Sequence, residues 1–265
     1  MNLEDRLDGR TVLITGGTAG IGLAAAIRLG AAGANVVVCG RNRARLVAAE
    51  SAIRAAGAPG VLGVRADCTD VDEVRDLHRA GTDAFGTVTG LVNNVGTSLK
   101  GSFLELTDEQ WQRDLDLKVF AAIRLARLVI SDLVTEGRPG RIVNILSIGG
   151  KHPGAGSAPT TVSRAAGIAL TKVLSKEFAA HDVLVNAICI GAIKAKQHDD
   201  RWEAEADDLD RAAFYARMAA ARGIPLGRVG EPEEVAGLIH FLLSDQGSYI
   251  TGVAINVDGG TSSSV

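Results

Sequence analysis

The chain has few aromatic residues and no strong excess of charge of either sign. Phe, Trp and Tyr make up 4% of its 265 residues, so a core has to be built mainly from Val, Ile, Leu and Ala. A formal net charge of -3 provides no positive surface for nucleic acid, and we expect no such partner. No segment approaches the ~18 consecutive apolar residues that a membrane-spanning helix needs, so we expect no membrane association.

Cysteine is also scarce, which limits metal and disulfide chemistry. The three cysteines, Cys39, Cys68 and Cys189, lie far apart in apolar, strand-like segments. No Cys/His pair has the spacing of a zinc site, so we expect no metal centre. Buried free thiols fit a reducing compartment, and residues 1–10 are acidic where a secretion signal would be apolar. Both features predict a cytoplasmic protein.

Short apolar segments alternate with longer helical patterns along the chain. The apolar segments are nearly continuous in Val, Ile and Leu, as is typical of strands buried on both faces, and they cover residues 11–15, 35–40, 60–66, 88–93, 141–147, 183–190 and 252–257. Helical patterns lie between them, at residues 21–32, 43–56, 71–84, 108–135, 162–180 and 232–243. This alternation predicts an α/β fold with a doubly wound, Rossmann-type parallel sheet. The length, residues 1–265, fits a single domain.

One segment interrupts the alternation before the last predicted strand. Residues 194–223 are rich in charge and include Asp199, Arg201 and Glu203, and we interpret them as an inserted pair of helices. Because the segment follows the carboxyl end of a strand, where such sheets bind ligands, it is a candidate lid over a pocket. A solvated surface excursion is the alternative. His198 and Tyr215 also fall here and are expected to be exposed.

A glycine-rich turn follows the first predicted strand and opens the first helix, at residues 15–22. Glycines let the backbone approach a pyrophosphate closely, and a helix N-terminus supplies free N–H groups and positive potential. The turn therefore predicts a nucleotide cofactor whose phosphates are bound by Gly16, Thr18, Gly20, Ile21 and Gly22.

The end of the second predicted strand indicates which nicotinamide cofactor the chain prefers. An acidic side chain here would accept a hydrogen bond from the ribose 2′-hydroxyl of NAD(H), but Gly40 and Arg41 occupy the position. A guanidinium suits the 2′-phosphate of NADP(H), with Arg43 and Arg45 nearby as further donors. We expect NADP(H) as the cofactor, with NAD(H) less favoured.

Polar residues follow the third and fourth predicted strands as well. Asp67 and Cys68 come after the third strand, where Asp67 is placed to reach the adenine, and Asn94 and Gly96 follow the fourth. These four residues are candidate cofactor contacts. Residues of this kind also serve simply to end strands, and both interpretations stay open.

These motifs are similar to those of the short-chain dehydrogenase/reductase family, and the resemblance extends over nearly the whole chain. It includes the glycine turn, the fifth strand with its terminal Ser147, and the closing segment at residues 249–260. The resemblance implies a seven-stranded parallel sheet, cofactor contacts from Gly191 and Ile193, and a small-molecule carbonyl or alcohol substrate. It also implies a homodimer or homotetramer that associates through the long helices at residues 108–135 and 162–180.

The chain departs from the family pattern at the centre of the active site. In the family, a serine polarises the carbonyl, a tyrosine transfers the proton, a lysine lowers the pKa of that tyrosine, and an asparagine helps to relay protons. Ser147 matches the serine, but Thr160, Arg164 and Lys118 stand at the other three positions. An aliphatic hydroxyl is a far weaker acid than a phenol, and a guanidinium cannot act as a base. Arg164 can still donate to ribose hydroxyls or stabilise an alkoxide.

Several groups could supply the missing proton. Lys118 could extend into the volume that the exchange of tyrosine for Thr160 leaves free. His152, on the loop after Ser147, titrates in a useful range. A water held by Ser147 and Thr160 is a further alternative.

The sequence favours an NADP(H)-dependent oxidoreductase that reduces a ketone or aldehyde, or oxidises the alcohol, with a non-standard proton donor. A positioned acid contributes roughly 10²–10⁴-fold in rate, so hydride transfer between aligned reactants can persist without the tyrosine. A second reading is a non-redox enzyme on the same fold, for which cofactor oxidation would not track product formation. A third is a nucleotide-binding sensor or partner subunit without turnover.

Overall fold

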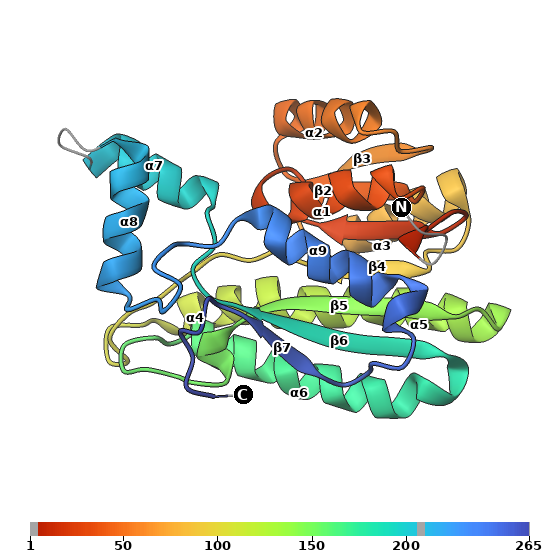
Figure 1. Cartoon of the computed structure of the whole chain (residues 1–265). Coiled ribbons are helices and arrows are strands. Elements are labelled where there is room, and N and C mark those ends of the chain that lie inside the picture. The colour runs from red at the N-terminus through yellow and green to blue at the C-terminus, as the bar shows by residue number, and fades with distance from the viewer. Residues whose placement is uncertain (1–4, 206–209, 265) are drawn as a thin grey trace.

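The computed structural model describes residues 5–205 and 210–264, which include one seven-stranded sheet (Figure 1). All neighbouring strands are parallel, in the order β3-β2-β1-β4-β5-β6-β7. The strands are β1 (Thr11–Thr15), β2 (Asn35–Gly40), β3 (Val61–Arg65), β4 (Gly90–Asn93), β5 (Gly140–Ser147), β6 (Val183–Ile190) and β7 (Ala254–Val257). The predicted Rossmann-type α/β fold is confirmed.

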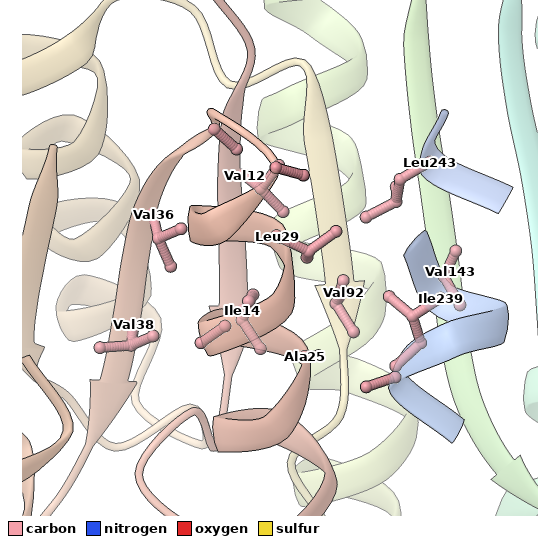
Figure 2. Close-up of a cluster of buried hydrophobic side chains, with 14 of the residues drawn as sticks. Val12, Ile14, Ala25, Leu29, Val36, Val38, Val92, Val143, Ile239 and Leu243 are labelled. Atoms are coloured by element: carbon pink, nitrogen blue, oxygen red, sulfur yellow. The ribbon is translucent and has the colours of Figure 1, made fainter. Parts of the chain in front are cut away.

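Helices cover both faces of the sheet because its strands are apolar on both sides. The helices outside the segment 194–223 are α1 (Gly20–Ala31), α2 (Arg43–Ala55), α3 (Val71–Phe85), α4 (Asp108–Leu115), α5 (Ala121–Glu136), α6 (Thr160–Phe178) and α9 (Pro232–Leu243). One buried cluster joins the strands to α1, α2 and α9, and a second joins them to α3 and α5. Figure 2 shows Leu29 of α1 and Ile239 of α9 meeting side chains of the central strands. Valine, isoleucine, leucine and alanine dominate both clusters, as the low aromatic content predicts.

The long helix predicted at residues 108–135 forms as one helical stretch, Asp108 to Glu136, with a wider turn in its middle. A π-helical turn, η2 (Asp116–Phe120), separates α4 from α5. Such turns insert one extra residue into a helix and occur often at functional sites. Lys118, which the sequence singles out, lies in the middle of this turn and is buried. The helix was predicted from the spacing of its hydrophobic residues, and one wider turn changes that spacing too little to be seen.

The predicted insertion does form two helices, α7 (Lys196–Glu205) and α8 (Arg211–Ala221), and residues 206–209 lie outside the described residues. The two helices project from one end of the sheet (Figure 1). They have a small core of their own, in which Phe214, Tyr215 and Met218 pack against Ala192 and Val229. The expectation that Tyr215 is exposed was therefore wrong.

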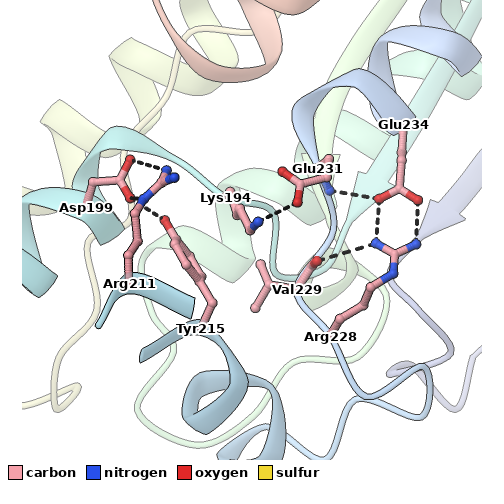
Figure 3. A network of polar contacts seen from close by, with 8 residues as sticks. All are labelled: Lys194, Asp199, Arg211, Tyr215, Arg228, Val229, Glu231 and Glu234. Atoms are coloured by element: carbon pink, nitrogen blue, oxygen red, sulfur yellow. Dashed lines mark hydrogen bonds and ion pairs between the residues drawn. The ribbon is translucent and has the colours of Figure 1, made fainter. Parts of the chain in front are cut away.

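Polar contacts join the two helices to each other and to the loop that leaves β6 (Figure 3). The Tyr215 hydroxyl donates to Asp199 at 2.8 Å, and Arg211 forms an ion pair with the same carboxylate. Lys194 pairs with Glu231, next to the start of α9, and lies 5.2 Å from the Tyr215 ring centroid. These contacts hold α7 and α8 beside the loop that leaves β6.

The three cysteines are free and buried, as expected. Cys39 and Cys68 sit on neighbouring strand ends, with their Sγ atoms 3.7 Å apart. In the described part of the chain, no helix has the length and apolarity that crossing a membrane requires.

Candidate active site

The glycine turn is built to receive an anion at the N-terminus of α1. Ala19, the residue before the helix, offers no side-chain hydrogen bond to the first N–H groups, and the first turn contains no acidic residue. Those donors are therefore available to a phosphate. A Cβ on Gly22 would lie 2.4 Å from the Gly16 carbonyl oxygen, so only glycine permits this tight turn. Asn94 supports it by donating from Nδ2 to the carbonyl oxygens of Thr15 and Gly16, at 2.9 and 3.2 Å.

The neighbouring strand ends present a cation beside the turn. Arg41 follows β2 with 76% of its side chain exposed, and its Nη1 lies 3.7 Å from Asp67 Oδ2. Asp67 Oδ1 accepts hydrogen bonds from the Thr69 amide and hydroxyl, so this carboxylate also shapes its own turn. Thr18 packs its methyl group against Gly40. The residues present fit a phosphorylated ribose better than a free 2′-hydroxyl, since the exposed group at this edge is a guanidinium.

Ser147 ends β5 opposite Ile190 of β6 and is half-buried. Its hydroxyl takes part in none of the hydrogen bonds found among residues 5–205 and 210–264. The position at the carboxyl end of a central strand and the unused donor together make it available to a substrate oxygen.

Thr160, by contrast, has a fully committed hydroxyl. Its Oγ1 accepts from the Leu99 amide at 3.0 Å and from Lys118 Nζ at 2.8 Å, and it donates to the Leu99 carbonyl oxygen at 2.7 Å. A hydroxyl has one donor and two acceptor positions, so none is left for a substrate or for a water shared with Ser147. Thr160 therefore fastens the loop after β4 to the start of α6.

Asp114 is a buried acidic residue beside these groups that the sequence analysis did not single out. Its Oδ1 pairs with Lys118 Nζ, and its Oδ2 accepts from Ser163 Oγ at 2.6 Å. The side chains of Asp114 and Lys118 are 1% and 0% exposed. The feature of the sequence that could have pointed to Asp114 is its spacing of four residues from Lys118. This spacing usually indicates an exposed ion pair on a helix.

Arg164 of α6 reaches the end of β5 and the loop after β4. Its Nη1 donates to the Ile145 carbonyl oxygen at 2.9 Å, and a Cβ on Gly96 would lie 2.6 Å from its Nη2. Its Nε is buried with no hydrogen-bond partner among the described atoms. Arg164 and Lys118 line a cavity of about 10 Å³ together with Asn93, whose Oδ1 is likewise buried and unpaired.

The surroundings shift the proton affinities of both cations. Burial lowers the pKa of Lys118 more than the hydrogen bond with Asp114 raises it, and the charge of Arg164 lowers it further. Burial also lowers the pKa of Arg164, against the opposing effect of Asp114, but a guanidinium remains charged at any physiological pH. Lys118 is thus a better acid than an exposed lysine.

The remaining candidate proton donors lie elsewhere. His152 is exposed and contacts Ser263 through Nδ1 at 3.0 Å. Burial raises the pKa of Tyr215 to about 12, with a further contribution from its hydrogen bond to Asp199. His198 lies against Tyr215 in the helical insertion, with ring centroids 6.5 Å apart. The structure brings Thr160, Lys118 and Arg164 together beside β5, the strand that Ser147 ends, and leaves His152 exposed.

Gly191 and Ile193 form the loop that leaves β6. A Cβ on Gly191 would lie 2.8 Å from Asp258 Cα, so the loop passes close to the end of β7. Ile193 is buried and bridges to Gly230. A hollow of about 480 Å³ lies on the Gly230 side of this loop, and neither Ser147 nor either of the two buried cations lines it.

Comparisons with known proteins agree with one another. A family model described as enoyl-(acyl carrier protein) reductase matches residues 16–262. The chain is 36% identical over 258 residues to the 3-oxoacyl-[acyl-carrier-protein] reductase of Synechocystis sp., covering 96% of this chain and 97% of that protein.

Two solved structures are similar over nearly their whole length. One is the NADPH-bound structure of a short-chain oxidoreductase from Pseudomonas aeruginosa PAO1 containing an atypical catalytic center. Its TM-score is 0.91 at 36% identity, covering 98% of this chain and 99% of that one. The other is the L-sorbose reductase of Gluconobacter frateurii complexed with NADPH and L-sorbose. Its TM-score is 0.93 at 30% identity, covering 99% and 100%.

The hydrogen bonds of Thr160 predict a structural effect of its hydroxyl. We expect Thr160→Val to lower the free energy of unfolding by about 1–3 kcal/mol, because the Leu99 backbone and Lys118 lose a buried partner. Thr160→Ser keeps the hydroxyl and should stay closer to the parent. Urea unfolding of the three proteins measures the difference, and equal stability of the Val and Ser variants would contradict this role.

Proposed function

The chain belongs to the short-chain dehydrogenase/reductase family, and we propose that it is an NADP(H)-dependent oxidoreductase that interconverts a ketone or aldehyde and its alcohol with a non-standard proton source. The observation that carries the proposal is the Ser147 hydroxyl, which has no hydrogen-bond partner among the described residues and ends a central strand at the same edge of the sheet as the open N-terminus of α1. The similar P. aeruginosa oxidoreductase, whose catalytic center is described as atypical, binds NADPH. The similar proteins from Synechocystis sp. and G. frateurii, which match over nearly the whole chain, are named as reductases.

The nucleotide would be held by groups from four strand ends. The N-terminus of α1 binds the pyrophosphate, Arg41 binds the 2′-phosphate, and Arg164 donates to the nicotinamide ribose. Gly96, Gly191 and Ile193 belong to the loops that would border the nicotinamide. When bound, NADPH supplies a hydride to the carbonyl carbon.

Ser147 and the two buried cations act on the substrate oxygen. The Ser147 hydroxyl donates to the carbonyl oxygen and orients it, and the positive charges of Arg164 and Lys118 stabilise the negative charge that develops there. As the C–O double bond becomes a single bond, its electron pair moves to oxygen, which then takes a proton. Thr160 does not donate this proton in the proposal, since its hydroxyl is already committed to Leu99 and Lys118.

Lys118 is the proposed source of the proton. Its ammonium group is buried, its pKa is lowered mainly by burial, and it lines a cavity of about 10 Å³ beneath the end of β5. A space of this size accommodates about one water, which can pass a proton from Lys118 toward the strand end. His152 is exposed, and we place it outside the proton path.

We also propose a domain organisation, a location and an oligomeric state. We propose one domain over residues 1–265, with α7 and α8 acting as a lid, and a cytoplasmic location that the buried free thiols support. A homodimer or homotetramer is supported by exposed apolar side chains on the two long helices. Val162 and Val173 of α6 are 48% and 57% exposed and lie three turns apart on one face.

Cofactor preference gives the first test of the proposal. We expect Arg41→Ala to raise the Kd for NADPH roughly tenfold, since a charge-assisted hydrogen bond to the phosphate is lost, and to leave the Kd for NADH unchanged. Arg79→Ala, an exposed arginine on α3, is the matched control. Fluorescence titration with each nucleotide measures both constants. A tighter complex of the parent with NADH than with NADPH would end the claim.

The reductase activity itself is tested by following NADPH oxidation and alcohol formation together over a panel of ketones and aldehydes. We expect the two to proceed one to one, and Ser147→Ala to lower kcat by roughly 10²–10³-fold because an oxygen-binding donor is lost. Ser51→Ala, on the exposed side of α2, should behave as the parent. Product without NADPH oxidation would indicate a non-redox enzyme, and nucleotide binding without turnover would indicate a sensor or partner subunit.

A proton donor with a lowered pKa gives reduction a characteristic pH dependence. The rate should be constant while Lys118 is protonated and fall as the pH rises through its pKa, at a pH below the usual value of 10.5. Lys118→Met should lose roughly 10²–10⁴-fold in kcat together with this fall. Lys176→Met, exposed on α6, is the control. A parent-like pH profile of Lys118→Met would assign the proton to another group.

A further inference from the structure

Asp114 is the feature of the site that the proposed function leaves unused. It is a carboxylate on α4 with a side chain 1% exposed, and a buried carboxylate is costly unless cations and hydrogen-bond donors surround it. Both of its oxygens are engaged, one by Lys118 Nζ and the other by Ser163 Oγ at 2.6 Å. These partners come from the π-helical turn and from α6, so the carboxylate joins the two elements that carry the buried cations.

The charges around Asp114 are unequal. The titratable groups that face this cluster in the described residues are Asp114 from α4, Lys118 from η2, Arg164 from α6 and Cys189 from β6. Asp114 opposes the effect of burial on the pKa of Lys118 and on the pKa of Arg164. Burial raises the pKa of the Cys189 thiol, which stays neutral. One carboxylate therefore serves two cations.

We infer that Asp114 is a positioning residue, whose charge keeps Lys118 in place as a buried cation next to Arg164 and so maintains the proton source on which the proposed function rests. The carboxylate does not touch the substrate oxygen. It acts through Lys118, and through Lys118 on Thr160, whose hydroxyl fastens the loop at Leu99. Without the charge of Asp114, Lys118 and Arg164 would lose the carboxylate that opposes the effect of burial on both, and Lys118 is the one that can lose its proton.

Direct titration of Lys118 tests this inference independently of catalysis. The chain has seven lysines, so lysine labelled with ¹³C at Cε gives a sparse NMR spectrum in which Lys118→Met identifies the signal of Lys118. We expect Asp114→Asn to move the titration midpoint of Lys118 down by about 1–3 pH units, the usual effect of losing a nearby opposite charge. Asp116→Asn, two residues away on the partly exposed side of the same turn, should leave it in place. An unchanged midpoint in Asp114→Asn would overturn the inference whatever the activity.

Kinetics then separate this inference from the proposed function. In Asp114→Asn, the pH at which kcat/KM for reduction falls should drop by as many units as the NMR midpoint of Lys118. In Asp114→Glu, this pH should be close to that of the parent. A lower rate with an unmoved pH profile indicates a merely structural role and counts against the inference. The NMR midpoint of Lys118 could move in Asp114→Asn while Lys118→Met keeps the activity of the parent. That result would support the role of Asp114 toward Lys118 and contradict Lys118 as the proton source.

Asp114→Asn could fail to fold, and the double variant covers that case. Removing Lys118 as well, in Asp114→Asn with Lys118→Met, should recover part of the stability in urea, because Lys118 then no longer adds a second unpaired charge beside Arg164. Recovery supports the charge pairing. Equal loss of folding in the single and double variants would show that Asp114 acts by packing and hydrogen bonds alone, and would overturn the inference.

Discussion

In a parallel sheet every strand ends at the same edge, and this constraint gathers the site from distant parts of the sequence. β1 delivers the glycine turn, β2 delivers Arg41, and β5 delivers Ser147, although these segments are separated by up to about half the chain. The strand order reverses direction between β1 and β4, so the loops that follow them diverge and leave room for a ligand. The helices on both faces bury the strands and hold this edge fixed.

A second constraint acts within that edge, where positive charge is buried. Arg164 and Lys118 bring two cations beside β5, with the Lys118 side chain fully buried and Arg164 partly buried. Such charges are most effective on a reacting oxygen when they are dry, but they are then most costly to keep. The contacts of Asp114, Ser163 and Thr160 reduce the free-energy cost of burying these cations.

Strong local patterns explain which features could be predicted from the sequence. The continuous Val-rich runs located β1 and β2 at their observed limits, and Ser147 and Arg41 were found because their positions follow directly from a strand end. Asp114 was missed, because an acid and a base four residues apart look the same on a buried helix face as on an exposed one. The π-helical turn and the burial of Tyr215 depend on tertiary packing, which leaves no periodic trace in the sequence.

The shared hydroxyl of Thr160 has a consequence for how such a site can change. Leu99, Lys118 and Asp114 all meet at or next to this one side chain, so the effect of a substitution at any of these positions depends on what the others are. Restoring tyrosine at 160 and lysine at 164 alone would leave the Leu99 backbone without its partner and Lys118 still buried. The effects of substitutions at positions 114, 118, 160 and 164 are thus interdependent. An evolutionary route from this centre to one with the family's tyrosine and lysine has to pass through intermediates. In these, a buried charge is unpaired or the Leu99 backbone lacks its hydrogen-bond partner.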